Sequence, residues 1–375
     1  MSTQKKSIVV VGGGVFGASC AIELVSLIAK TELRSSVALT LIEKRDMNVF
    51  LPATLRMAVE DHDEEYMKPY DKLFAGYDDI GTVVKGSAAA IEKDARNVVL
   101  EDGKKIHYDV LVLATGATFG APSSPPTDRT DMIAYYKNIR ARIEKSKDIV
   151  IIGGGISGAE LASEIKDKHG ASKTVTIVHS SNLPGSGIFP ENLRRQLDKI
   201  MQNLNVITIY NAYGDDSEDG QVNVTYKIGD KKSKTIPADY VIKCNLVHNN
   251  SSFIPQEWLN KDGQVKISDT FEVINTSNVF AIGDINDFDE WKLASQVQSA
   301  RPISAANVLS AVKGEKAEMH YATKLIGIGI TMGKRYATGS IRLPIFGDRV
   351  LPGFIIRKLK GDDIRALKFA KILGY

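Results

Sequence analysis

The feature that most constrains the fold of this 375-residue chain is a glycine pattern that occurs twice. Each copy follows an apolar run that predicts a strand, over 7–11 and 148–152, and leads into a helical pattern, over 18–29 and 159–168. The first copy consists of Gly12, Gly13, Gly14, Val15, Phe16 and Gly17. The second copy consists of Gly153, Gly154, Gly155, Ile156, Ser157 and Gly158.

Between a strand and a helix, this pattern predicts a binding site for a dinucleotide. The first glycine allows a tight turn, the second lets the backbone approach a pyrophosphate, and the third lets helix and strand pack closely. The start of the helix adds free N–H groups and the positive end of the helix dipole. Two copies therefore predict two dinucleotides held by one protein.

The composition excludes several classes of protein. The chain is 43% hydrophobic and 25% charged, and its length suits two or three domains. A net charge of +3 is too small to argue for a nucleic-acid partner, and no apolar run is long enough to span a membrane. Residues 1–6 lead directly into the first strand, and Ser2 stands where N-myristoylation needs glycine. We expect a cytoplasmic protein that is not secreted.

The reactive side chains point away from thiol and metal chemistry. Cys20 and Cys244 lie far apart in the sequence, which indicates a reducing compartment and offers no Cys-x-x-Cys pair for a flavoprotein disulfide reductase. The six histidines are scattered singly. We therefore predict no metal site and no Ser-His-acid triad.

A third strand end belongs with the two glycine patterns. The run 277–282 predicts a buried strand that stops at Gly283 and Asp284, with a helix expected from Trp291 to Leu309. Gly283 permits a close backbone approach. In a Rossmann topology such strand ends lie on the ligand side, so Asp284 would place its carboxylate over a ribityl hydroxyl or a pyrophosphate-bound water.

The order of these elements predicts an α/β fold with two Rossmann-like, three-layer domains and a small C-terminal α+β module. Further strands are expected at 37–43, 108–114, 174–178 and 240–244, a linker at 117–131 and a surface hairpin loop at 214–220. We assign residues 1–120 and 246–325 to one dinucleotide-binding domain, 121–245 to the other, and 326–375 to the module, which is a candidate for membrane or dimer contact.

The sequence resembles the two-dinucleotide flavoprotein family of pyridine-nucleotide oxidoreductases. The likeness rests on the first glycine pattern, Ala114-Thr115-Gly116, the second glycine pattern and the run 279–284, in that order. Within the family, 48–56 and 178–180 resemble the apoptosis-inducing-factor and ferroptosis-suppressor branch, with its fungal homologues. The likeness covers the chain from about residue 5 to about residue 310 well and the tail more loosely.

The resemblance implies that the first glycine loop binds FAD. Glu43, where the second strand ends, is placed to accept hydrogen bonds from the adenosine ribose. The other residues assigned to FAD are Lys44 and Ala89 at the adenine, Arg56 at the diphosphate, and Ala114, Thr115 and Gly116 at the ribityl chain. The alternatives are an exposed cation for Lys44, ordinary strand packing for Ala89 and a salt bridge for Arg56.

The second loop is expected to bind NADH or NADPH. His179 and Ser180 stand where an acidic residue would bind the ribose 2′-hydroxyl and repel a 2′-phosphate, so neither nucleotide is excluded. The resemblance places Glu160 near the nicotinamide carboxamide as a catalytic residue. The alternative for Glu160 is a first-turn carboxylate favoured by the helix dipole.

The segment 287–296 is expected to start the helix whose N-terminus faces the flavin. Unpaired N–H groups at Leu293 or Ala294, with Lys292 nearby, would stabilise negative charge on the reduced ring. Lys292 is therefore the second catalytic candidate and Leu293 a cofactor contact. Asp289 and Glu290 can equally serve as N-terminal caps of that helix.

The tail, 341–375, interleaves basic and apolar residues and ends in an amphipathic segment. This pattern is typical of a helix on an anionic membrane surface, and equally of a terminal helix docked on the body of the protein.

The sequence predicts an FAD-dependent NAD(P)H oxidoreductase that reduces a quinone-type acceptor, peripheral on mitochondrial or lipid-droplet membranes if it binds them. Two alternatives stay open: a slow NAD(P)H-sensing flavoprotein with a signalling role in cell death, and a ferredoxin or rubredoxin reductase. A homodimer is also compatible with the sequence.

Overall fold

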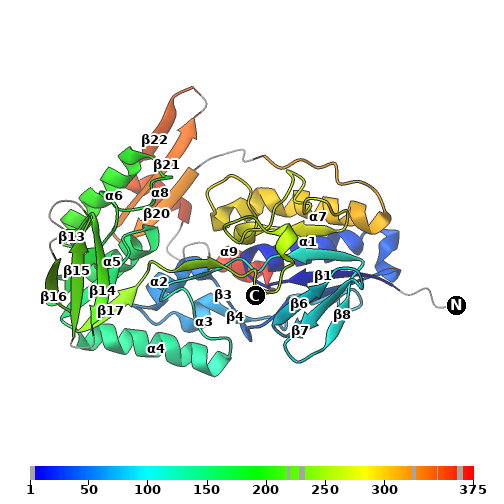
Figure 1. Cartoon of the computed structure of the whole chain (residues 1–375), viewed down its shortest axis with the longest axis horizontal. Coiled ribbons are helices and arrows are strands. Elements are labelled where there is room, and N and C mark those ends of the chain that lie inside the picture. Colours follow the sequence, from blue (N-terminus) through cyan, green and yellow to red (C-terminus); the bar gives the residue numbers. More distant parts are fainter. Residues whose placement is uncertain (1–4, 218–219, 228–232, 323–326, 344, 361–365) are drawn as a thin grey trace.

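The computed structural model describes the chain apart from residues 1–4, 218–219, 228–232, 323–326, 344 and 361–365. It confirms the α/β fold class. Two parallel sheets lie one after the other along the long axis of the molecule, with helices and small antiparallel sheets against them (Figure 1).

The first parallel sheet has five strands in the order β19-β9-β1-β2-β5. Its strands are β1 (Lys6–Val11), β2 (Val37–Glu43), β5 (Gly81–Lys85), β9 (Val110–Leu113) and β19 (Val279–Ala281). Both faces are buried, because Ile8 and Val10 pack towards helices α1 (Val15–Ile28) and α7 (Val297–Lys313), while Val9 and Val11 pack towards a three-stranded antiparallel sheet. That sheet consists of β6 (Ala88–Glu92), β7 (Asn97–Leu100) and β8 (Lys105–His107).

The second parallel sheet repeats this arrangement with four strands in the order β13-β12-β11-β17. Its strands are β11 (Asp148–Ile152), β12 (Thr174–Val178), β13 (Ile207–Ile209) and β17 (Tyr240–Lys243). Ile149 and Ile151 face the core with α5 (Ile156–His169) and α6 (Glu191–Asn203), whereas Val150 and Ile152 face an antiparallel sheet. That sheet consists of β14 (Ala212–Ser217), β15 (Gln221–Tyr226) and β16 (Ser233–Pro237).

The surface loop predicted at 214–220 is wrong over most of its length. Strand β14 runs through Gly214 to Ser217, and residues 218–219 lie outside the described residues. The strand contains the exposed Asp215 and Asp216, while Ala212 and Gly214 lie towards β11 and β12. A Cβ atom at Gly214 would lie 3.3 Å from the side chains of Ile152 and Val178.

Two antiparallel connectors join the parallel sheets. Strand β10 (Ala117–Phe119) pairs with β18 (Val247–Asn249). The side chain of Asn250 links the two connectors, because its Nδ2 donates to the carbonyl of Thr115 at 2.9 Å and its Oδ1 accepts from Thr118 Oγ1 at 2.7 Å. The connectors lie beside the domain boundaries predicted from the sequence, which stay predictions. Helix α4 (Arg129–Lys145) and the short elements β3 (Met47–Val49), α2 (Thr54–Met57), α3 (Asp63–Tyr66) and β4 (Met67–Pro69) complete this region.

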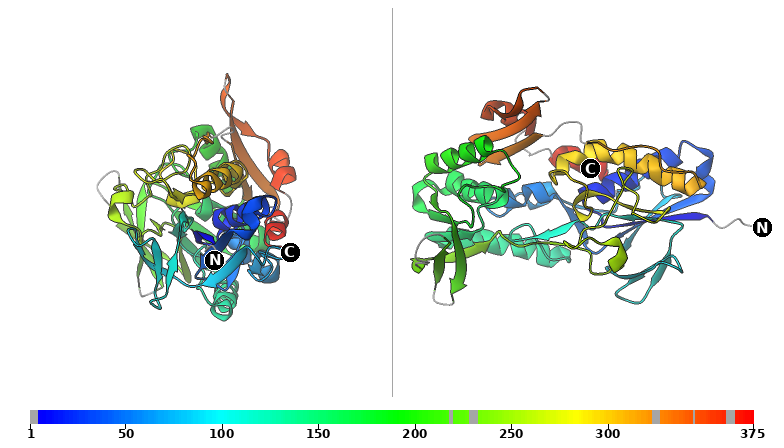
Figure 2. Two further views of the ribbon diagram at one scale, coloured as in Figure 1. Left: turned by 90° about the vertical axis from the view of Figure 1, so that its right-hand side faces the viewer. Right: turned by 45° about the horizontal axis from the view of Figure 1, so that its top comes forward.

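The C-terminal residues contact both halves of the molecule. Strands β20 (Gly327–Met332), β21 (Tyr336–Leu343) and β22 (Gly347–Leu351), with α8 (Gly353–Lys360), pack beside α5 and α6. Helix α9 (Ala366–Ile372) instead packs beside α1 and α3. Figure 2 shows the β21–β22 hairpin projecting from the body of the molecule.

Candidate functional site

The first glycine loop joins β1 to α1 at the carboxyl edge of the five-stranded sheet. Gly12 has φ +102°, and a Cβ there would lie 2.5 Å from the carbonyl oxygen of Ala114; a Cβ on Gly17 would lie 1.8 Å from the carbonyl oxygen of Gly12. Beside Gly14, in contrast, no atom lies within 4 Å of an added Cβ. Helix α1 has no side-chain N-cap and no acidic residue in its first turn. The loop therefore offers open space and free N–H groups to a phosphate.

Glu43 ends β2 directly beside this loop. Its Oε2 accepts a hydrogen bond from the Gly13 N–H at 2.5 Å, and its Oε1 accepts one from the Arg45 N–H at 2.9 Å. The carboxylate is 5% exposed. The Nε atom of Arg45 is buried and finds no hydrogen-bond partner among the described residues, whereas Lys44 is exposed. An acceptor and an unsatisfied donor thus lie beside the first glycine loop, and the predicted contact of Glu43 with the adenosine ribose stays a prediction.

Two buried residues that the sequence reasoning did not assign hold the loop from behind. Asn48 Nδ2 donates to the carbonyl oxygen of Gly13 at 2.7 Å, and the Tyr70 hydroxyl donates to the same oxygen at 2.9 Å. Burial raises the pKa of Tyr70 well above its ordinary value, and the charge of Glu43 acts in the same direction. Asn48 is a single polar residue within an apolar segment, and that was the available signal.

The other strand ends predicted to meet FAD converge on the same edge. Gly283 has φ +77°, and a Cβ there would lie 2.9 Å from the ring of Phe16. Asp284 follows in a 3₁₀ turn; burial raises its pKa, while Lys292 opposes that rise. Gly116 has open space at its Cβ position, and Thr115 Oγ1 donates to the carbonyl of Asn250 at 2.8 Å.

Ala89 lies at an irregularity in β6. The pairing with β7 joins Ala88 to Leu100 and Ala90 to Val99, so that Ala89 has no partner in the register. The residue is exposed. The irregularity leaves the predicted contact between Ala89 and the adenine a prediction.

The helix predicted from Trp291 begins later. Helix α7 starts at Val297, after a 3₁₀ turn over Ala294–Gln296, and Leu293 is extended with φ −121° and ψ 137°. Two contacts hold 291–293 out of the helix. The Trp291 ring packs edge-on against Phe189 at 5.0 Å between centroids, and Lys292 Nζ donates to Asn286 Oδ1 at 2.7 Å. Burial lowers the pKa of Lys292, although Glu290 and Asp284 oppose this.

The second glycine loop repeats the geometry of the first. Gly153 has φ +107°, and a Cβ on Gly158 would lie 1.9 Å from the carbonyl oxygen of Gly153, whereas beside Gly155 the space is open. Helix α5, which contains Ile156 and Ser157, has no side-chain N-cap and no acid in its first turn. The second loop therefore also offers open space and free N–H groups at the carboxyl edge of its sheet.

His179 occupies the position that Glu43 has in the first half. It follows β12, and its Nδ1 accepts a hydrogen bond from the Gly154 N–H at 3.1 Å. An accepting nitrogen is unprotonated, so this contact assigns the ring proton to Nε2, which is buried without a hydrogen-bond partner among the described residues. Burial lowers the pKa of His179, and the charge of Arg194 acts in the same direction. Ser180 is half-buried next to it.

The remaining two candidates lie between the halves. Glu160 Oε1 accepts from the Thr331 N–H at 3.2 Å and lies 3.6 Å from Lys360 Nζ, so α5 is tied here to the C-terminal strands and α8. Burial raises the pKa of Glu160, and Lys360 opposes the rise. Arg56 of α2 forms an ion pair with Glu164 of α5. Its predicted contact with the FAD diphosphate stays a prediction, because it would have to coexist with this pair.

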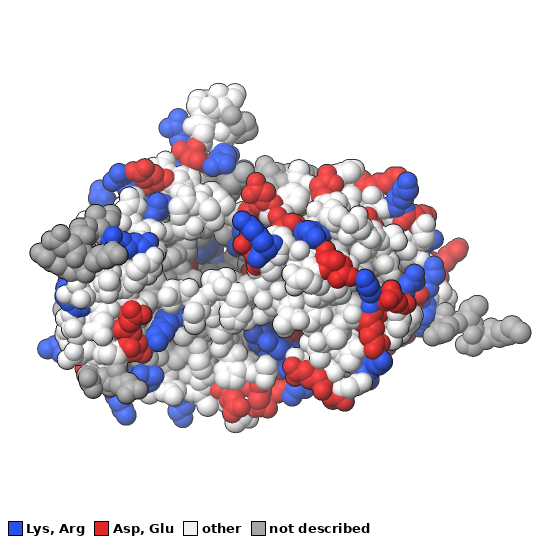
Figure 3. All heavy atoms as spheres, viewed as in Figure 1, with Lys and Arg blue, Asp and Glu red and all other residues white. Residues whose placement is uncertain are grey.

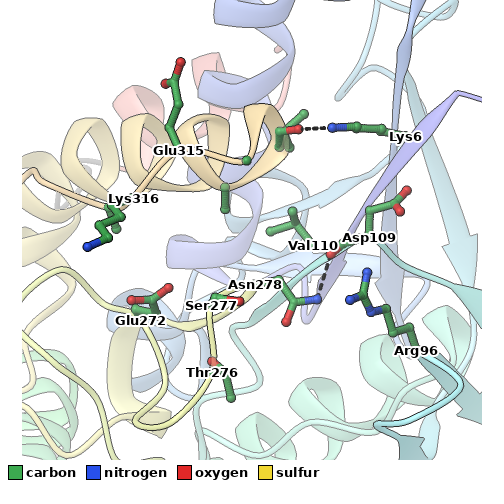
Figure 4. A pocket seen from close by; sticks show the side chains of 14 residues that line it. Lys6, Arg96, Asp109, Val110, Glu272, Thr276, Ser277, Asn278, Glu315 and Lys316 are labelled. Carbon is green, nitrogen blue, oxygen red and sulfur yellow. Dashed lines mark hydrogen bonds between the residues drawn. The ribbon is translucent and has the colours of Figure 1, made fainter.

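A cavity of about 520 Å³ lies elsewhere, at the opposite edge of the first sheet (Figure 4). It is bounded by the start of β1 at Lys6, the start of β9 at Val110, the residues before β19, and the end of α7. Lys6 Nζ donates to the carbonyl of Val312 at 2.6 Å across it. Its position at the amino ends of the strands separates it from both glycine loops.

Two glycine loops, each at the carboxyl edge of a parallel sheet and each backed by a strand-end acceptor, are the arrangement typical of proteins that bind two dinucleotides. The chain belongs to the pyridine nucleotide-disulphide oxidoreductase family, whose model matches residues 6–306. This confirms the family predicted from the motifs. It also establishes flavin- and nicotinamide-type oxidoreduction as the chemistry of the family.

Individual relatives extend the match over most of the chain. It is 31% identical to the FAD-dependent oxidoreductase FVFD30 of Flammulina velutipes over 82% of this chain and 96% of the relative. It is 29% identical to apoptosis-inducing factor 1 of Saccharomyces cerevisiae over 97% of both chains, and 26% identical to ferroptosis suppressor protein 1 of Xenopus tropicalis over 98% and 96%. The solved sulfide:quinone oxidoreductase of Aquifex aeolicus shares the fold, with a TM-score of 0.74 at 18% identity over 98% and 90%.

Proposed function

We propose that this protein is an FAD-dependent NAD(P)H oxidoreductase that passes electrons from NADH or NADPH to a quinone-type acceptor. One observation carries the two-nucleotide part of the proposal: the Gly13 N–H meets Glu43 as the Gly154 N–H meets His179, at 2.5 and 3.1 Å. The loops are alike in geometry and differ in the charge of the acceptor. A carboxylate suits the ribose hydroxyls of FAD, and a neutral imidazole tolerates either nicotinamide nucleotide.

The cysteines support an acceptor that needs no protein thiol. Cys20 lies in α1 and Cys244 follows β17, and burial raises the pKa of each thiol to about 12. Neither is therefore a ready thiolate nucleophile. A disulfide substrate reduced through a cysteine pair does not suit this chain, whereas a quinone takes its electrons from the flavin itself, which supplies hydride and single-electron chemistry when bound.

The residues of the chain divide the remaining work. The free N–H groups of α1 and α5 bind phosphates, Glu43 and the unsatisfied Nε of Arg45 orient the adenosine, and Ala89 offers its backbone at the adenine edge. Glu160, half-enclosed between α5 and β20, is proposed to orient the nicotinamide carboxamide. Lys292, near Asp284 at the end of β19, is proposed to balance negative charge at the pyrimidine edge of the ring.

Anaerobic stopped-flow tests the proposal. The purified protein with its flavin is mixed with NADH or NADPH, the bleaching of the flavin absorbance is followed, and a short-chain ubiquinone is then added. We expect rapid bleaching and rapid recovery with quinone. A long-lived reduced state that quinone does not discharge would refute the quinone reductase and favour a slow, signalling flavoprotein.

A further inference from the structure

The apolar face of the last helix is already covered by the protein. In α9, Phe369 and Ala370 are each 5% exposed and Leu373, just beyond it, is 1% exposed. The Phe369 ring lies 5.4 Å from the ring of Phe50, and Tyr375 contacts Asp71 through its hydroxyl. In the described part of the chain, no helix is long and apolar enough to cross a bilayer. The amphipathic pattern of α9 is therefore explained by docking on the protein.

The β21–β22 hairpin presents an uncovered apolar surface at its tip. Ile345 is 87% exposed and Phe346 is 64% exposed, and the hairpin stands out from the body of the molecule (Figures 1 and 2). At this exposed end of the hairpin, the two large apolar side chains are largely in contact with water rather than packed against the protein. The Arg349 guanidinium lies 6.0 Å from the Phe346 ring centroid, so a cation accompanies the aromatic residue.

The segment that carries this tip is strongly basic. Residues 327–360 contain seven Lys or Arg and one acidic residue, a net charge of +6, while the whole chain carries +3. Four of these seven cations face carboxylates: Arg342 pairs with Asp348 at 2.8 Å, Lys334 with Glu60 at 2.8 Å and Arg335 with Asp167 at 2.6 Å, and Lys360 lies 3.6 Å from Glu160. The other three, Arg349, Arg357 and Lys358, form no ion pair with another described residue. Figure 3 shows Lys and Arg atoms on both sides of the projecting hairpin, acidic atoms between them, and uncharged atoms towards its end.

We propose that Ile345 and Phe346 insert into the headgroup region of an anionic lipid bilayer, with Arg349 beside them drawn to the lipid phosphates. A bilayer gains from two apolar side chains backed by a cation, because the side chains enter the acyl boundary while the guanidinium stays at the phosphates. A second copy or a protein partner needs roughly 800 Å² per side for a stable interface, which a two-residue tip does not supply. The inference does not depend on the electron acceptor.

Vesicle flotation of the full chain with its flavin tests this. Vesicles of phosphatidylcholine alone are compared with an equal mixture of phosphatidylcholine and phosphatidylserine. We expect binding to the anionic vesicles only, reduced by about tenfold or more in Ile345→Ser/Phe346→Ser because most of the apolar insertion is lost. The matched control is Ile207→Ser/Tyr213→Ser. It removes one aliphatic and one aromatic side chain, in β13 and β14, that are 50% and 54% exposed. This control should bind as the parent does.

A spectroscopic probe separates insertion from simple charge attraction. In a Phe346→Cys variant, an environment-sensitive fluorophore reacts selectively because burial raises the pKa of Cys20 and of Cys244 to about 12. Its emission should shift to the blue on anionic vesicles. The proposal is overturned if the parent does not float, if the serine variant floats as well as the parent, or if the probe stays in water. Loss of a dimer in the serine variant without any vesicle binding would also overturn it, in favour of a second copy.

Discussion

Arg56 and Glu164 form an ion pair that joins the two halves of the molecule inside the protein. Arg56 Nη2 lies 3.1 Å from Glu164 Oε1, and the residues are 4% and 5% exposed. Burial acts to lower the pKa of Arg56, but Glu164 and Tyr66 outweigh it and raise the pKa, so the guanidinium stays charged. The pair thus links α2 to α5, the helix that follows the second glycine loop.

We expect Glu164→Ala to destabilise the protein by about 3–5 kcal/mol, because it leaves the Arg56 charge buried without its carboxylate. Urea unfolding followed by tryptophan fluorescence measures this. The control is Glu191→Ala, which breaks the exposed pair with Arg195 and should cost less than about 1 kcal/mol. Equal costs for the two variants would show that the buried pair does not hold the halves together.

The second glycine loop permits a matched pair of substitutions. In Gly158→Ala the new Cβ would lie 1.9 Å from the carbonyl oxygen of Gly153, so we expect loss of the loop geometry and a lower melting temperature. In Gly155→Ala the Cβ has open space and the backbone is extended, so stability should change by less than about 1 kcal/mol while nicotinamide nucleotide binding weakens. Calorimetric titration with NAD⁺ and NADP⁺, beside thermal unfolding, distinguishes the two effects. Tight binding by the Gly155 variant would place the pyrophosphate elsewhere.

His179→Glu should give the second glycine loop a carboxylate at the position that Glu43 has beside the first. A carboxylate at this strand end binds the ribose 2′-hydroxyl and repels a 2′-phosphate, so the ratio of kcat/KM for NADH to that for NADPH should rise by roughly tenfold or more. Steady-state kinetics with both nucleotides gives this ratio. Ser181→Glu, two residues further along, serves as the control for added charge alone. An unchanged ratio in the His179 variant would remove this residue from nucleotide selection.

Glu160 predicts a specific dependence of stability on pH. Burial raises the pKa of its carboxyl group in the folded protein. The protonated carboxyl therefore stabilises the fold fully below the unfolded pKa of about 4.3. This stabilisation is lost as the pH rises through the higher pKa of the folded protein. The melting temperature of the parent should therefore fall relative to Glu160→Gln between about pH 4 and neutrality. Glu32→Gln, on an exposed turn, is the control. If the melting temperature of the parent instead rose relative to that of Glu160→Gln over this pH range, the raised pKa of Glu160 would be contradicted.

Local patterns predicted the frame of this protein well. The strands at 37–43, 148–152 and 174–178 were predicted with the boundaries that the structure has, because a strand buried on both faces reads as a continuous apolar run. The helix expected from Trp291 failed, because Trp291 packs against Phe189, which lies about a hundred residues away in the sequence, and a pattern along the chain does not show such a contact. Asn48 and Tyr70 escaped notice for the same reason.

The sequence by itself therefore determined the α/β class, the two glycine loops and the acceptor that follows each second strand, since strand, turn and helix are neighbours in the chain and their chemistry is local. Only the tertiary structure decided that Arg56 pairs with Glu164, that Glu160 meets Lys360, and which amphipathic surface of the tail remains open. An apolar stripe is equally stabilised by a protein surface or by lipid, because both remove it from water. The fold covers α9 and leaves Ile345 and Phe346 exposed.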